Sequence, residues 1–530
     1  MRRPVLSAVL AAASAFALAI AAPAGAKTFK WANDGDTSSL DPYVLNETFL
    51  LSFTGNIYEP LVRRDGKLKL EAALAAEWSN PSPNVWRFKL RQGVKFHNGN
   101  PFNADDVVFS YNRARADGSN IKSYFSSVKE IRKIDDYTVE METSVPNPIL
   151  VDELATWYIM DKEWCEANNT VKPADLTKKE ESFATRNANG TGPFILKARE
   201  AEVKTTLGPN PNWWDKAKHN LTDVQFSVVK NPATRVSALL SGELDMIYNV
   251  PPQDQDRIAK TKGLRVLITP ETRIVYLGFD ILRDELQDSS VKGKNPFKDP
   301  RVREAFFRGI DVNAIKTKVM RGESAPTTLM VATMIKGYDK ALDKRVAYDP
   351  KKAKELLAAA GYPKGFEVGM DCPNDRYVND EKICVAAAAM LSQIGIKVNL
   401  KAQTKSLFFQ KILAPRFETS FFMLGWTPAT FDAHNMIQNL AYCRKQGVPK
   451  GLFNVGGYCN AKVDELSDKI LVETDQAKRT AMMHEALKTI RDEFAYIPLH
   501  QQTVVWAAKS SVDIVQTAAN TFPLMYVKVK

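Results

Sequence analysis

The segment from residue 84 to 112, NVWRFKLRQGVKFHNGNPFNADDVVFSYN, constrains the fold more than any other part of the chain. Apolar and basic residues alternate from 86 to 91, which is typical of a strand with one face on a core and the other in solvent. Asn98-Gly99 predicts a turn. Asn103 can then cap a helix whose first turn is acidic. Nothing in the segment is obviously reactive, so we interpret it as scaffold.

Residues 1–26 have the composition of an export signal. A basic start, Arg2-Arg3, precedes an apolar run from 5 to 22, and Ala24-Gly25-Ala26 is a small-x-small cleavage site. A membrane anchor is the weaker alternative, because serines interrupt the run and Pro23 follows it. We therefore predict an exported protein cleaved after Ala26.

The composition is that of a soluble globular chain. Of 530 residues, 25% are charged and 45% hydrophobic, and the length exceeds one typical domain. The net charge of +11 is spread among acids, without an arginine-rich arm or a zinc pattern, so nucleic acid is not an expected partner. After the signal, no run reaches the roughly 18 apolar residues that a membrane span requires.

Motifs of catalysis are missing from the sequence. We find no G-x-S-x-G elbow, phosphate-binding loop, H-E-x-x-H helix or G-x-G-x-x-G fingerprint. The histidines are far apart and lack ligand spacing: His97, His219, His434, His484 and His500. No catalytic residue, metal site or cofactor is predicted. Scattered residues can converge in a fold, so a secreted hydrolase stays as a distant alternative.

Five cysteines in an exported chain favour disulfides. Cys372 with Cys384 and Cys443 with Cys459 would each close a short loop and leave Cys165 free. Neither pair has the C-x-x-C spacing of metal or redox sites. Sequence does not determine connectivity, so this pairing is a hypothesis.

Strands and helices alternate along the remaining chain. Helices are predicted at 231–242, 349–361, 380–393 and 474–494, each with an Asn-Pro or Asp-Pro start, a glycine stop or an amphipathic pattern. A strand is predicted at 396–400. This alternation predicts an α/β protein with mixed sheets.

Several motifs, taken in order, resemble those of one family. Besides the segment at 84–112, they are LEAALAAEW (70–78), GTGPF (190–194), NWW (212–214), ALLSGELD (238–245), DPRVR (299–303), YDPKKAKELLAAAG (348–361) and Gly425-Trp426. The chain is similar, over nearly its whole length after the signal, to the periplasmic oligopeptide/dipeptide-binding receptors of ABC transporters, the bacterial extracellular solute-binding proteins of family 5.

The resemblance implies a two-lobed periplasmic binding protein with an extra inserted subdomain. The expected divisions are lobe I at 27–58, 186–270 and 496–530, the inserted subdomain at 59–185, and lobe II at 271–495. Chain crossings near 269–274 and 495–500 would form the hinge, and ligand would shift the population from open to closed.

Arg376 is the main candidate for ligand binding. Residues 373–379 are similar to the P-x-x-R-x-x-N stretch in which dipeptide receptors carry the arginine that holds the ligand's carboxylate, and a guanidinium suits that task. The alternative is a solvated arginine paired with Asp375 or Asp380.

The expected amine anchor departs from the family pattern. Dipeptide receptors carry an aspartate three residues after the tryptophan of Gly-Trp, where this chain has Ala429. A buried ammonium needs an anion. Asp432 is a candidate replacement, and its alternative role is a cap before His434. The departure favours a carboxylate ligand without a free amino terminus over an ordinary dipeptide.

Other candidates for the pocket are aromatic residues and one loop of lobe I. Each aromatic residue could instead belong to the hydrophobic core rather than to the pocket. The loop is a candidate because family members approach their ligands with the equivalent loop. They are Tyr377, Trp426, Phe431, Phe408, Phe409, Asn46, Glu47 and Thr48.

The resemblance implies a receptor that binds a peptide or peptide-like carboxylate and delivers it to a membrane permease. A receptor for a metal chelate, haem or sugar is the alternative, because pockets vary on one fold. The expected partners are two permease subunits and their ATPases, which other genes would supply. The receptor itself is expected to be a periplasmic monomer.

Overall fold

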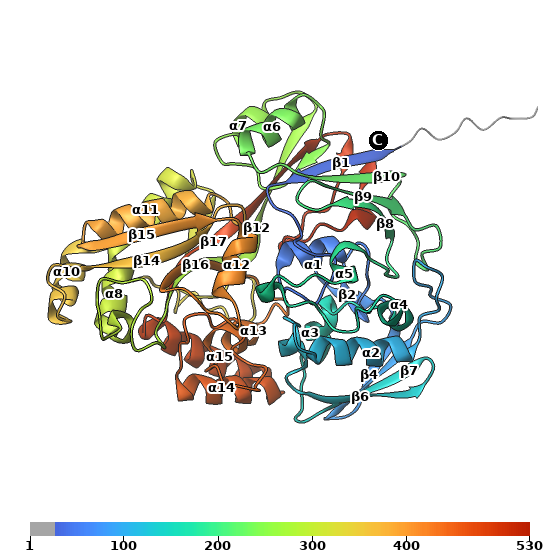
Figure 1. Cartoon of the computed structure of the whole chain (residues 1–530), viewed down its shortest axis with the longest axis horizontal. Coiled ribbons are helices and arrows are strands. Elements are labelled where there is room, and N and C mark those ends of the chain that lie inside the picture. Colours follow the sequence, from blue (N-terminus) through green and yellow to red (C-terminus); the bar gives the residue numbers. More distant parts are fainter. Residues whose placement is uncertain (1–26) are drawn as a thin grey trace, which may run out of the picture.

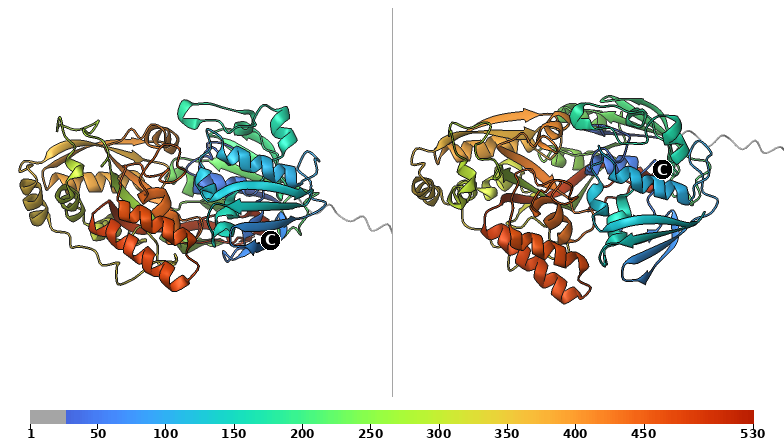
Figure 2. Two further views of the ribbon diagram at one scale, coloured as in Figure 1. Left: turned by 90° about the horizontal axis from the view of Figure 1, so that it is seen from below. Right: turned by 60° about the horizontal axis from the view of Figure 1, so that its bottom comes forward.

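The computed structural model describes residues 27–530 (Figure 1). The predicted signal and its cleavage site lie outside these residues. No helix within them is long and apolar enough to cross a membrane. Two masses of chain lie on either side of the long strands β12 (Leu264–Phe279) and β17 (Tyr496–Lys509), and both views of Figure 2 show the same division. Elements of the expected lobe I gather in one mass and those of lobe II in the other.

One sheet runs through both masses in the order β15-β14-β16-β12-β17-β11-β1-β10-β9-β8. The middle strands β12 and β17 are antiparallel, with register shifts between Pro270 and Ile274 and between Val275 and Tyr276. Such irregularities bend a strand and increase its twist. The first shift falls in the crossing at 269–274, and the second lies opposite Pro498 and His500, in the crossing at 495–500; the resemblance implies the hinge at these two crossings.

Lobe I is built on parallel pairing of β1 (Thr28–Asn33) with β10 (Asp223–Val228) and β11 (Met246–Ile247). The sheet continues into the antiparallel strands β9 (Lys204–Pro209) and β8 (Phe194–Glu200). Further elements of this lobe are α1 (Thr48–Thr54), α6 (Pro232–Leu240), α7 (Gln255–Ala259), β18 (Val512–Asp513) and β19 (Lys528–Val529).

The segment at 84–112 folds as predicted. β5 (Val85–Leu90) buries Phe88 and Leu90, and Asn103 caps α2 (Ala104–Arg115) in a capping box with Asp106. β5 belongs to a separate antiparallel sheet, β4-β5-β7-β6. Its other strands and the short elements around it are β4 (Ala75–Ser82), β6 (Val128–Asp135), β7 (Thr138–Thr143), β2 (Val62–Arg64), β3 (Leu70–Ala72), α3 (Leu150–Glu153), α4 (Lys162–Ala167) and α5 (Phe183–Arg186).

Lobe II carries the parallel strands β14 (Phe366–Pro373) and β15 (Ile396–Gln403), with β16 (Phe421–Trp426) parallel to β14. The predicted helices and strand are present as α6, α10, α11, α15 and β15. The helices of this lobe and its short strand are α8 (Pro300–Gly309), α9 (Val312–Ala314), α10 (Pro350–Ala359), α11 (Asp380–Ser392), α12 (Lys405–Ile412), α13 (Ala433–Met436), α14 (Ala461–Val472), α15 (Gln476–Asp492) and β13 (Ser324–Pro326).

A buried ion pair ties the sheet of β4–β7 to lobe I. Asp41, in the loop after β1, accepts two hydrogen bonds from the guanidinium of Arg113 on α2, at 2.9 and 2.5 Å. Neither side chain is exposed, and Arg113 also donates to the carbonyl of Thr170. Because every contact of this pair is made inside the protein, loss of one partner would leave a buried charge.

Replacing Arg113 with alanine should therefore lower the free energy of unfolding by about 3 to 5 kcal/mol. Replacing Lys89, whose pair with Glu77 is exposed, should cost about 1 kcal/mol or less. Urea unfolding followed by tryptophan fluorescence measures both. Equal losses in the two variants would contradict a structural role for the buried pair.

The cysteines lie as the local pairing hypothesis places them. Disulfides join Cys372 to Cys384 and Cys443 to Cys459, and Cys165 is free and buried. The first disulfide links the end of β14 to α11.

Thiol titration of the native protein purified without reductant should detect no fast-reacting thiol, because Cys165 is buried. Titration after denaturation should detect one thiol per chain. Five reactive thiols after denaturation would reject both disulfides.

Candidate ligand-binding site between the lobes

A cavity of about 220 Å³ lies between the two lobes. Lobe I contributes α1 and residues 59–68, lobe II contributes Arg376, Tyr377 and residues 424–431, and the C-terminal segment 517–525 completes the wall. Most lining residues are apolar, and polar and charged residues lie among them, as in sites for small organic molecules.

The lobe I wall is set by the start of α1. Glu47 is the N-cap, and its carboxylate accepts the backbone N–H groups of Phe49 and Leu50 at 3.0 and 2.7 Å. Asn46 accepts a hydrogen bond from the hydroxyl of Tyr124 at 3.0 Å. Asn46, Glu47 and Thr48 all line the cavity, where the resemblance places them.

The lobe II wall includes the loop between β14 and α11. The carboxylate of Asp380 accepts the backbone N–H groups of Arg376 and Tyr377, at 2.9 and 3.0 Å. The hydroxyl of Tyr377 accepts the N–H of Gly425 at 2.8 Å. The Cys372–Cys384 disulfide joins the elements on either side of this loop. The loop therefore holds Arg376 and Tyr377 in place at the cavity.

The guanidinium of Arg376 is paired with a residue of the other lobe. Its Nη2 lies 2.8 Å from Oε1 of Glu47, and the two side chains are 9% and 3% exposed. Lys405 lies 3.8 Å from the other carboxylate oxygen. This arrangement differs from both sequence-based expectations for the Arg376 side chain, because its anion is neither Asp375 nor Asp380 and comes from the protein itself. Asp380 instead binds the backbone of Arg376.

The charge state of Glu47 follows from these contacts. Burial by itself would raise its pKa, but Arg376, Lys405 and the two backbone N–H groups lower the pKa of Glu47 to about 2. Glu47 is therefore an anion over the whole physiological pH range. The pair gives an electrostatic link between the lobes.

The aromatic candidates divide between cavity and core. Trp426, Ala429 and Phe431 line the cavity, as does Phe409. Phe408 is fully buried in the core, as its alternative interpretation stated. The indole N–H of Trp426 donates to Asn435 at 3.0 Å, which orients its ring.

The structure places Asp432 at a helix cap and not in the cavity wall. Its carboxylate caps α13 by accepting the N–H of His434 at 2.9 Å and is bonded to both terminal nitrogens of Arg479. It is 2% exposed and does not line the cavity. The capping interpretation describes Asp432 correctly, because a buried carboxylate takes the neighbours that compensate its burial.

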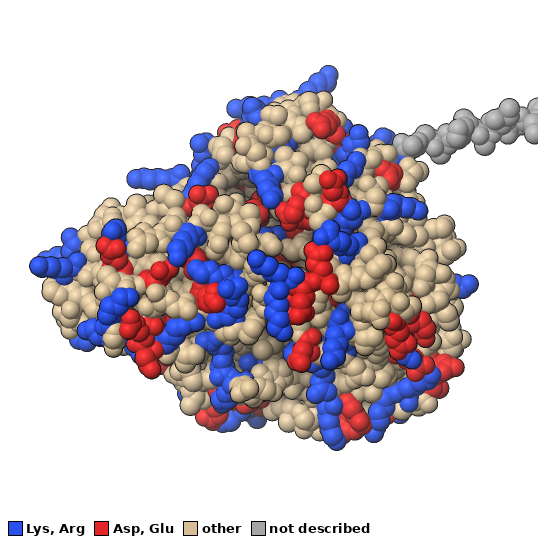
Figure 3. All heavy atoms as spheres, viewed as in Figure 1, with Lys and Arg blue, Asp and Glu red and all other residues tan. Residues whose placement is uncertain are grey.

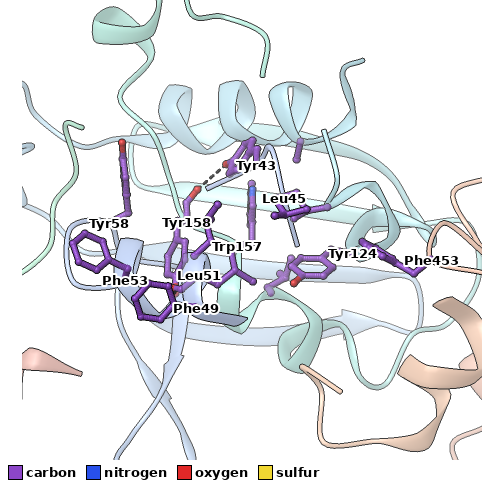
Figure 4. Packing of buried hydrophobic residues seen from close by; sticks show 14 of the residues in the cluster. Tyr43, Leu45, Phe49, Leu51, Phe53, Tyr58, Tyr124, Trp157, Tyr158 and Phe453 are labelled. Atoms are coloured by element: carbon purple, nitrogen blue, oxygen red, sulfur yellow. Dashed lines mark hydrogen bonds between the residues drawn. The ribbon is translucent and has the colours of Figure 1, made fainter. Parts of the chain in front are cut away.

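Sequence reasoning missed much of the lobe I wall. In Figure 4, Leu51 lies next to Tyr158, Leu45 lies on the other side of Trp157, and Phe453 lies beyond Tyr124. Leu45, Leu51, Tyr158 and Phe453 all line the cavity. Arg63, Arg64 and Glu59 also line the cavity. The motif NWW was a signal for this region, because both indoles donate to Glu59, at 3.1 and 2.8 Å. The C-terminal segment 517–525 carries no such signal.

Comparisons with known proteins agree with this arrangement. The model of bacterial extracellular solute-binding proteins, family 5, matches residues 69–447. The glutathione-binding protein GsiB of Escherichia coli K12 is 26% identical over 509 residues, 94% of each chain. Its name describes a binding protein.

Solved structures of two-lobed periplasmic binding proteins share the fold. The protein DppA of Helicobacter pylori, in complex with the peptide STSA, superposes with a TM-score of 0.81 at 25% identity and covers 95% of this chain and 98% of its own. The protein AgaA of A. tumefaciens R10, in complex with agropinic acid, has a TM-score of 0.83 at 24% identity and covers 95% and 99%. The predicted two-lobed fold is confirmed, and the chain belongs to family 5 of the bacterial extracellular solute-binding proteins.

Proposed function

We propose that this protein is the receptor of an ABC importer, which closes its two lobes over a peptide-like solute and delivers it to a membrane permease. The observation that carries the proposal is the cavity, because both lobes contribute to its wall. The names of its relatives support the ligand class, since GsiB binds glutathione and DppA is in complex with a peptide.

Closure is the step that would couple binding to transport. The walls meet through the Glu47–Arg376 pair and through Arg64, whose guanidinium lies 4.7 Å from the ring centre of Phe431. These contacts join opposite lobes, so an open form would lack them. A ligand that touches both walls favours the closed form through its differential affinity for the two states.

The hinge carries a buried polar network. Glu271 on β12 is fully buried and accepts hydrogen bonds from Gln502 at 2.6 Å and Asn520 at 3.0 Å, and its carboxylate lies 2.9 Å from Arg273. Directional contacts of this kind select a defined arrangement of the strands they join. The network would thus restrict the lobes to a limited set of angles.

The assembly and location are proposed by analogy with the family. The protein would act in the periplasm after cleavage behind Ala26, as a monomer that docks on two permease subunits whose ATPases supply the energy. The proposed divisions remain lobe I at 27–58, 186–270 and 496–530, the inserted subdomain at 59–185 and lobe II at 271–495. On the face in Figure 3, basic and acidic residues are interspersed. This face therefore has no continuous basic surface of the kind that binds nucleic acid.

The alternatives receive less support. The cavity lining formed by residues 27–530 contains neither histidine nor cysteine, so direct coordination of a soft metal is not proposed. The hydrolase alternative has no support from the relatives, which are solute-binding proteins.

A mixture of free and end-blocked dipeptides should raise the melting temperature of the protein, because a ligand that binds only the folded state stabilises it by mass action, by about 2.7 kcal/mol at a hundred times Kd. Trp426→Ala should weaken binding by about ten-fold or more, as loss of a central aromatic contact does. Phe183→Ala, at an exposed position on α5, is the matched control and should bind normally. Equal binding by both variants would contradict the assigned site.

Arg376→Ala should shift the population toward the open form, because it leaves Lys405 as the only cation beside the buried Glu47 carboxylate. Breaking a buried pair costs about 3 to 5 kcal/mol. Small-angle X-ray scattering should then show a larger radius of gyration in the presence of the mixture of free and end-blocked dipeptides. Arg416→Ala, which removes an exposed pair with Glu418, should scatter like the wild type. An unchanged radius in Arg376→Ala would rule out the pair as an interlobe link.

A further inference from the structure

The charged side chains that line the cavity balance one another. Three are acidic and three are basic, namely Glu47, Glu59, Asp65, Arg63, Arg64 and Arg376. Each of these side chains already makes an ion pair or hydrogen bonds with other protein groups in the absence of a ligand. The contacts of each therefore decide what charge the cavity can accept from a solute.

Arg63 and Arg64 are held by acids of their own lobe. The guanidinium of Arg63 lies 2.8 Å from Glu71 and 2.6 Å from Asp215, and 3.5 Å from Glu59. Arg64 lies 2.6 Å from Asp152 and donates to the carbonyl of Leu68. Neither arginine is free to bind a carboxylate of the ligand without loss of an existing ion pair.

Arg376 is paired with an anion that is itself fixed. Glu47 is anchored by two backbone N–H groups of α1 and by Lys405, in addition to Arg376. A ligand carboxylate at Arg376 would either displace this anchored carboxylate or lie beside it. Two carboxylates at one buried site repel each other, and the second would lose its hydration without full compensation.

The acids are equally unavailable to a ligand ammonium. Glu59 accepts hydrogen bonds from Thr191, Trp213 and Trp214. Asp65 accepts the backbone N–H groups of residues 67 and 69 through one carboxylate oxygen, and it is partly exposed to solvent. Position 429, on the opposite wall, is alanine. An ammonium in the buried part of this cavity would have no uncommitted anion, and an isolated buried charge is costly.

The remaining wall suits apolar groups. It includes Leu45, Leu51, Tyr158, Leu413, Leu424, Trp426, Phe431, Phe453, Phe522 and Met525. Apolar ligand surface buried against these side chains supplies the main favourable term for binding.

From these contacts we infer that the ligand is a peptide-like solute without a free amino terminus and without a free carboxylate, such as a cyclic or doubly end-blocked peptide. The inference rests on the proposed function and narrows its ligand class. It departs from the carboxylate ligand that the resemblance implied, because the Arg376 site is occupied by Glu47.

The test uses four dipeptide libraries of the same side-chain composition, in the free, N-acetylated, C-amidated and doubly blocked forms. Each is incubated with the purified protein, and the retained members are counted by mass spectrometry after ultrafiltration. The doubly blocked library should be retained about ten-fold or more above each of the other three. This factor is the loss of affinity expected when burial of one unpaired charge has a free-energy cost at the low end of its range.

Two variants change the preference in opposite senses. Glu47→Gln removes the anion beside Arg376, so retention of the N-acetylated acids should rise about ten-fold. Ala429→Asp supplies an anion on the opposite wall, so retention of the C-amidated amines should rise by a similar factor, about ten-fold. Glu181→Gln, which removes a carboxylate from an exposed pair with Arg186, is the matched control and should keep the wild-type preference.

The outcomes separate the two claims. Preferential retention of free or N-acetylated acids by the wild type would overturn the inference while the receptor function stands. Retention of none of the four libraries would overturn the peptide-like receptor itself, and the inference with it. If Glu47→Gln does not fold, Ala429→Asp and the wild-type preference still decide the matter, because neither alters α1.

Discussion

The buried pair between Glu47 and Arg376 is the contact on which the closed structure depends. Two charges removed from water are tolerated only when they are paired and hydrogen-bonded. Each partner is therefore held by its own lobe, Glu47 by the first turn of α1 and Arg376 by the loop that Asp380 organises. The pair forms only when the lobes meet, so the same interaction reports closure and sets the electrostatics of the cavity.

Local structure was predictable because local rules determine it. The strand and capped helix at 84–112 and the Asp-Pro start of α10 fold as their patterns indicate. Resemblance to a family predicted the architecture and named Arg376, Trp426 and Glu47 as candidates for ligand binding. All three line one cavity. Tertiary partners were beyond either kind of reasoning. The anion at Arg376 comes from a distant segment, and Asp432 binds Arg479.

Two features of the cavity, Ala429 and the Glu47–Arg376 pair, have the same consequence for a charged ligand. Alanine at 429 leaves one wall without an anion, and Glu47 leaves the other without a free cation. Either feature alone would alter one end of a peptide ligand. Together they make a cavity in which every lining charge except that of the partly exposed Asp65 already has a partner of opposite charge, while its apolar surface remains available. A shared fold with a different pocket is the usual way in which one architecture serves many solutes.

The most direct test is a crystal structure of the protein with the solute that it retains from its native environment. The account predicts that the Nη2 of Arg376 stays within hydrogen-bond distance of Glu47, as it is here at 2.8 Å, with an uncharged ligand against Trp426. A ligand carboxylate bonded to Arg376, with Glu47 displaced, would contradict the account.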